Sequence, residues 1–167
     1  ESKHLYFIAE AFFIYACFHL DSDARTLDLE DLKSNQIFID TDVIFQLFVG
    51  CSHQKRFLSD LIKGTHRLGV KMLVVMSSIT EFVRRVTKAN RDFVEMNFPT
   101  SLPEIALDSL GDVIKNFIQN HVSSELNWSE YIRSLIGHQH EETLRCQFVL
   151  QKLEELYNIE LAAFPTS

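Results

Sequence analysis

The chain has 167 residues, 46% of them hydrophobic, which suits a single domain with a substantial core. Its net charge of −7 argues against a dedicated duplex-binding protein, because phosphate contacts need basic side chains, but it does not exclude a nuclease whose acids hold a metal ion. Three dispersed cysteines, at positions 17, 51 and 146, form neither a metal motif nor a disulfide framework. They predict an intracellular, cytoplasmic location with a reducing environment.

Residues 1–35 are predicted to form a helical extension that precedes the domain. Residues 5–20 are very apolar, but the stretch is shorter than the ~20 residues that a membrane-spanning helix needs, and Glu10 lies in its middle. We therefore expect no membrane segment and a buried helix over residues 3–20 that packs on the domain or on a protein partner.

The rest of the chain, residues 36–167, is predicted to be a helix-rich α/β domain. Its apolar runs lack the polar alternation of half-exposed strands, which is typical of a buried parallel sheet. The expected strands cover residues 36–40, 71–76 and 159–164. The expected helices cover residues 43–49, 52–68, 78–93, 101–121, 127–137 and 141–157. This alternation predicts a parallel central sheet flanked by helices, with right-handed crossovers.

Polar residues follow the first two predicted strands. Asp40, Thr41 and Asp42 come directly after the first strand, and Ser77 and Glu81 follow the second. Because the carboxyl ends of adjacent parallel strands meet at one sheet edge, these side chains are expected to lie close together. Carboxylate and hydroxyl oxygens suit Mg²⁺ or Mn²⁺, and such an ion can support phosphoryl transfer.

Structural roles for the same acids stay open at this point. Asp40 is a residue type that favours the N-cap of a helix, and Asp42 can complement the dipole of the first turn. Ser78 and Glu81 have the spacing of a capping box, which would leave Glu81 with no role in a site.

Residues 36–91 resemble a PIN domain. The resemblance rests on an apolar strand, Asp-Thr-Asp, two helices, a second apolar strand, Ser-Ser and then Thr-Glu-Phe. It implies a Mg²⁺- or Mn²⁺-dependent ribonuclease in which Asp40 is the first acid and Glu81 the second. Asp42 stands where the family often has Asn and is the third catalytic and metal-binding candidate, with Thr41 and Ser77 as supporting residues.

The family's third acid, which usually opens a later helix, has no clear match. Glu141 and Glu142 open the last predicted helix, although Glu is not the usual choice, and Asp112, one turn after Asp108, is a weaker candidate. If none of these residues is the third acid, we expect that the domain is incomplete and that this acid lies beyond Ser167. Residues 99–137 exceed a minimal PIN domain and are expected to be a helical insertion.

Basic residues follow the second candidate acid. Arg84, Arg85, Lys88 and Arg91 share the polar face of the helix that is predicted to carry Glu81. They are candidates for contacts to RNA phosphates, and a solvated helix face explains them equally well.

Two other functions use the same residues. A degenerate PIN-like module would serve protein interaction through its apolar N-terminal helix. A haloacid-dehalogenase-like phosphatase would use Asp40 as nucleophile, Asp42 as acid and base, and Ser77 as the phosphate-binding hydroxyl. That family usually has Gly-Thr where this chain has Val43-Ile44, and its later acid pair is missing. Arg133 and His138 have the spacing of HEPN ribonucleases, but the predicted strands contradict that all-helical fold.

Overall fold

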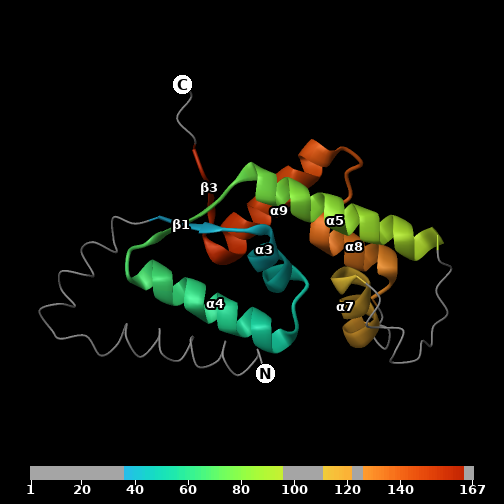
Figure 1. Ribbon diagram of the computed structural model, residues 1–167, viewed down its shortest axis with the longest axis horizontal. Helices are drawn as coiled ribbons and strands as arrows, with labels where there is room; N and C mark the ends of the chain where they lie inside the picture. Colours follow the sequence, from blue (N-terminus) through green and yellow to red (C-terminus); the bar gives the residue numbers. More distant parts are fainter. Residues whose placement is uncertain (1–35, 96–110, 122–125, 164–167) are drawn as a thin grey trace, which may run out of the picture.

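A computed structural model describes residues 36–95, 111–121 and 126–163 (Figure 1). The predicted extension over residues 1–35 and the helix start at residues 100–104 lie outside these described residues. The elements, in chain order, are β1 (Gln36–Ile39), α3 (Thr41–Phe48), α4 (Ser52–Arg67), β2 (Lys71–Val74), α5 (Met76–Glu95), α7 (Asp112–His121), α8 (Trp128–Ile136), α9 (Glu142–Tyr157) and β3 (Glu160–Leu161). None of the helices in the described ranges is long and apolar enough to cross a membrane.

The described strands form a parallel sheet in the order β1-β2-β3. Gln36 pairs with Lys71 at one end of β1, and Ile39 pairs with Val74 at the other. Leu73 pairs with Glu160 on the other side of β2. The predicted helix-rich α/β fold with a parallel sheet flanked by helices is therefore confirmed, although β3 is shorter than the predicted strand over residues 159–164.

The long helix α5 is the centre of the core. Its buried residues are Ile79, Phe82, Val83, Val86 and Ala89. It packs against α3, α7, α8 and α9, and Figure 1 shows it running along the molecule with α7 and α8 at one end. At that end the buried side chain of Trp128 stacks on Phe93 with ring centroids 3.9 Å apart.

Local signals set most helix ends. Gly69 follows α4 with φ +78°, and Asn158 ends α9 with φ +52°, conformations that Gly and Asn adopt at low cost. Asn127 caps α8 by accepting from the backbone N–H of Glu130. Cys51 is the N-cap of α4, and its N–H donates to the side chain of Gln54.

Strand β1 differs from the sequence prediction. The apolar run over residues 36–40 predicts burial on both faces, but Ile37 is 42% exposed and Phe38 is 54% exposed. Only Ile39 is buried. β1 also lies at an edge of the described sheet, where it pairs with β2 on one side.

Candidate functional site

The first two strand ends form one edge of the sheet. Ile39 pairs with Val74, so the residues that follow both strands lie side by side. Asp40 follows β1 as the N-cap of α3, with extended backbone, and its Oδ1 accepts a hydrogen bond from the N–H of Val43 at 3.0 Å. The cap role foreseen for Asp40 therefore exists, and it uses one of the two carboxylate oxygens.

A hydrogen bond joins the two junctions. The buried hydroxyl of Thr41 donates to Glu81 Oε2 at 2.9 Å, and the carbonyl of Ser78 lies farther from the same hydroxyl at 3.4 Å. The alternative of a Ser78–Glu81 capping box is wrong, because α5 begins at Met76 and already includes Ser78. Glu81 is instead held beside the residue that follows Asp40.

Asp42 faces a different partner. Its Oδ1 accepts from Arg85 Nη1 at 3.2 Å, and the same guanidinium lies 4.1 Å above the ring of Phe45. Arg85 Nη2 is also 3.9 Å from Asp112 Oδ2. Arg85 therefore lies between Asp42 and Asp112, and both acids balance its charge.

The acids at the start of α9 divide into one paired and one solvated carboxylate. Glu142 accepts two hydrogen bonds from Arg84, at 3.0 and 2.9 Å. The bonds lower the pKa of Glu142 and raise that of Arg84. Glu141 is the exposed N-cap of α9 and its side chain makes no cap bond. The third-acid candidate Asp108 lies outside the described residues.

Asp40 and Glu81 differ from Asp42 in forming no ion pair within the described residues. In the part of the chain that the structure describes, no three His, Cys, Asp or Glu side chains converge on a common point. Asp40 and Glu81 are the two acids at the strand ends, and their hard oxygens suit Mg²⁺ or Mn²⁺. They would supply part of a coordination shell, as is usual for Mg²⁺, which keeps several water or phosphate ligands.

Cationic side chains surround Glu81. A hollow of about 380 Å³ is lined by Ser77, Thr80, Glu81, Arg84, Arg85 and Lys88. The predicted supporting hydroxyl of Ser77 and three of the four candidate phosphate-binding residues, Arg84, Arg85 and Lys88, thus share one surface with the second acid. This surface combines a carboxylate, hydroxyl donors and positive charge.

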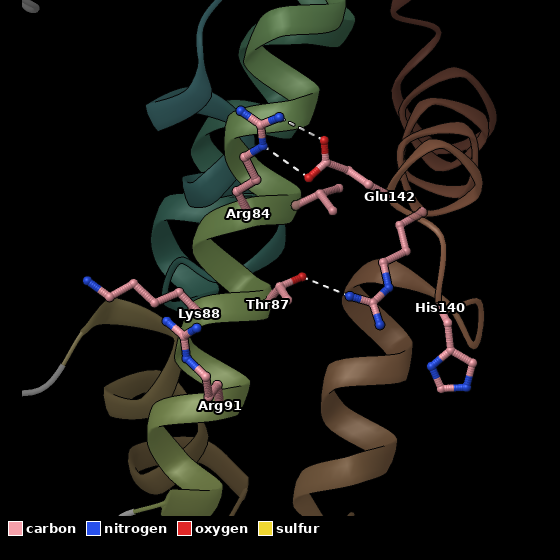
Figure 2. A pocket seen from close by; sticks show the side chains of 8 residues that line it. Arg84, Thr87, Lys88, Arg91, His140 and Glu142 are labelled. Atoms are coloured by element: carbon pink, nitrogen blue, oxygen red, sulfur yellow. Dashed lines mark hydrogen bonds and ion pairs between the residues drawn. The ribbon is translucent and has the colours of Figure 1, made fainter.

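A second pocket, of about 290 Å³, lies between α5 and the start of α9 (Figure 2). Its lining adds Arg91, His140 and Arg145, of which Arg145 and His140 were not predicted as site residues. Arg145 donates to the carbonyl of Gln139 at 2.7 Å and to the hydroxyl of Thr87 at 2.9 Å. No local spacing marks Arg145, since only the packing of α9 on α5 brings it here.

Comparisons with known proteins give neither a family nor a function for this chain. No protein-family model matches this chain, and no curated protein or solved structure matches it either.

Proposed function

We propose that the chain is a Mg²⁺- or Mn²⁺-dependent ribonuclease of the PIN type, acting on RNA phosphodiesters at the edge formed by β1 and β2. The observation that carries the proposal is the hydrogen bond from Thr41 to Glu81. It joins Glu81, the second acid of the motif, to the residue that follows the first acid, Asp40, although 40 residues separate Thr41 from Glu81 in the sequence.

Each residue has a distinct role in this proposal. Asp40 and Glu81 would hold the ion, which supplies charge stabilisation for the phosphoryl transition state. Thr41 positions the Glu81 carboxylate. Arg84 and Lys88 attract phosphate oxygens, for which guanidinium and ammonium groups are suited.

Asp42 acts through Arg85 in the proposed site. The ion pair at 3.2 Å fixes the guanidinium beside Phe45, on the same face of α5 as Glu81. Ser77 offers a hydroxyl donor to a substrate oxygen or to the attacking water. The overall reaction is hydrolysis of the phosphodiester by that water.

An intracellular, reducing location belongs to the same proposal. Cys51 is a free and exposed thiol, and Cys146 is free and buried. Exposed free thiols are usual where disulfides do not persist.

The test is cleavage of mixed single-stranded RNA with Mn²⁺. Asp40→Asn and Glu81→Gln are expected to lower the rate by about 100-fold or more, because each removes a carboxylate that stabilises transition-state charge through the ion. Asp60→Asn, at an exposed position on α4, is the matched control and should cleave like the wild type. EDTA should abolish cleavage in every sample. Equal rates for the wild type and Asp40→Asn would remove the proposal.

A degenerate module for protein interaction is the second candidate. The ion pairs of Asp42 with Arg85 and of Glu142 with Arg84 favour it, because both engage acids that an active site would need. It predicts no Mn²⁺-dependent cleavage. The phosphatase alternative instead predicts phosphate release from a generic monoester that Asp40→Asn abolishes.

A further inference from the structure

The outer side of α4 carries an apolar stripe. Phe57, Leu61 and the C-cap residue Leu68 are 38%, 49% and 43% exposed, and Gly64 lies between them in the sequence. Since successive residues of an α-helix are about 100° apart around its axis, these four positions fall within about 60° of one another. Figure 1 shows α4 at the margin of the described structure, below β1. We call these four positions the α4 stripe.

Little of α4 is buried in the described structure. The helix packs on α3, β2 and α9, yet among its 16 residues, all of them described, only Ile62 is buried. Most of the stability of a helix in a protein comes from the packing of its apolar face, because short helices are marginal in water on their own. A partner on the α4 stripe would supply the burial that this helix lacks.

Gly64 indicates that such a partner approaches closely. Apart from the helix's own backbone, a Cβ built at this position meets no described atom within 4 Å, so nothing in the described structure requires a glycine here. Glycine inside a helix is destabilising relative to alanine, and it is used where another backbone must come close. A helix that packs along the α4 stripe would make that approach.

The chain itself contains a segment that suits the stripe. Residues 5–20, which lie outside the described residues, are apolar except for Glu10 and His19. As the helix that the sequence predicts, this segment measures about 24 Å, and α4 with its 16 residues also measures about 24 Å. The segment can therefore cover the whole length of the stripe.

The point where the described chain begins places this segment within reach. Gln36 pairs with Lys71, three residues after Leu68, so the chain enters the sheet near one end of the α4 stripe. From that end to Phe57 the helix rises by about 17 Å, whereas residues 21–35 can span up to about 50 Å. A short tether gives an attached segment an effective concentration in the millimolar range, far above that of a second copy at micromolar concentration. The same chain is therefore the favoured occupant.

We propose that residues 5–20 dock on the α4 stripe of the same chain and cover Phe57, Leu61 and Leu68. The surface on which the apolar segment packs is then the domain itself, and a protein partner of this segment must first displace it from α4. The contact is independent of the proposed cleavage chemistry.

The test measures how fast a maleimide labels a thiol placed on the stripe. The full chain carries Cys17→Ala and Cys51→Ser, which leaves the buried thiol of Cys146 as a reporter of folding. Leu61→Cys is compared with Lys63→Cys, an exposed position on the charged flank of α4. Each rate is divided by that of the same variant unfolded in urea. Labelling at position 61 is expected to be about tenfold slower than at position 63 or slower still, because docking must open before the reagent reacts.

The identity of the occupant is tested by changing the segment. Phe12→Asp/Phe13→Asp places two charges in its middle, and burying an unpaired charge is costly. This variant should raise the rate at position 61 to within about threefold of that at position 63, because the stripe is then open. Phe12→Ala/Phe13→Ala should give an intermediate rate. Cys146 should stay unlabelled in both variants, and the alanine variant decides if the aspartates unfold the chain.

Three results would overturn the inference. Equal rates at positions 61 and 63 in the chain with an unchanged segment would show that the stripe is open to solvent. Slow labelling at position 61 that persists in the variants of Phe12 and Phe13 would mean that another part of the chain covers it. Protection that disappears on dilution by about 100-fold would assign the contact to a second copy, since a contact within one chain does not depend on protein concentration.

Discussion

At the scale of single residues, Thr41 links the two halves of the candidate site. Its side chain is 7% exposed, while the Glu81 carboxylate that it contacts belongs to an exposed residue. A buried hydroxyl has few orientations, so the bond restricts the rotamers of a long acidic side chain. A carboxylate fixed in this way loses less conformational entropy when it binds an ion.

Replacing Thr41 by Val is predicted to impair the site while preserving the fold. Val has the same shape but no donor, so Glu81 is no longer held. Cleavage should fall by about 10- to 100-fold, as for other groups that orient a metal ligand, and the free energy of unfolding by about 1 kcal/mol. Thr41→Ser keeps the hydroxyl and should restore most of the cleavage. Wild-type cleavage by Thr41→Val would show that the bond has no catalytic role.

Tyr131 is a residue whose burial makes stability depend on pH. Its hydroxyl donates to Asn116 Oδ1 at 2.9 Å inside the core, and burial raises its pKa well above the ordinary value of about 10. Above about pH 10 the unfolded chain ionises at this position and the folded chain does not. The stability that Tyr131 contributes is therefore present below about pH 10 and is lost as pH rises toward the folded pKa.

The variant Tyr131→Phe tests the direction of this pH dependence. At about pH 8 it should unfold more easily than the wild type by about 1–2 kcal/mol, because Asn116 loses a buried donor. Above about pH 10 the difference should shrink by about 1.4 kcal/mol per pH unit. Urea unfolding across this range measures it, and Tyr157, whose pKa burial also raises, is present in both proteins and cancels. A difference that stays constant to about pH 11 would contradict the burial argument.

At the scale of elements, the sequence could predict which segments are helices and strands. It was less informative about how deeply each segment is buried. The chain's turn residues, such as Asn127 before α8 and Asn158 after α9, act locally and mark element ends correctly. The burial of the β1 side chains depends on what packs on the two faces of the sheet, which no local pattern encodes. The start of α5 was misplaced for a related reason, because the spacing of Ser78 and Glu81 mimics a cap inside a helix that already begins at Met76.

Two adjacent residues of β1 differ strongly in their exposure to solvent, and this difference gives a prediction about stability. Ile39 is 3% exposed and Phe38 is 54% exposed. Ile39→Ala should lower the free energy of unfolding by about 2–4 kcal/mol, because it leaves a cavity, whereas Phe38→Ala should cost less than about 1 kcal/mol. Urea denaturation of both variants measures the two losses. Equal losses would mean that Phe38 is covered in solution.

At the scale of the whole molecule, the chain separates its charges. The cations of α5 and Arg145 of α9 gather around the two hollows, while the net charge is −7. The sequence could predict that the residues following β1 and β2 lie at one edge of the sheet, because parallel topology brings strand ends together. It could not predict the meeting of Arg145 with α5, because that depends on how α9 packs in three dimensions.

The negative net charge also sets the control for a test of ion binding by the whole protein. Any added salt relieves self-repulsion in a chain of −7 and raises its stability slightly, so Mn²⁺ must be compared with NaCl at equal ionic strength. At equal ionic strength, an ion held by Asp40 and Glu81 should add about 2.7 kcal/mol to the free energy of unfolding when its concentration is 100 times Kd. Asp40→Asn should lose most of this increment, while Asp60→Asn should keep it. Thermal and urea unfolding measure both, and an equal increment in the wild type and Asp40→Asn would place the ion elsewhere.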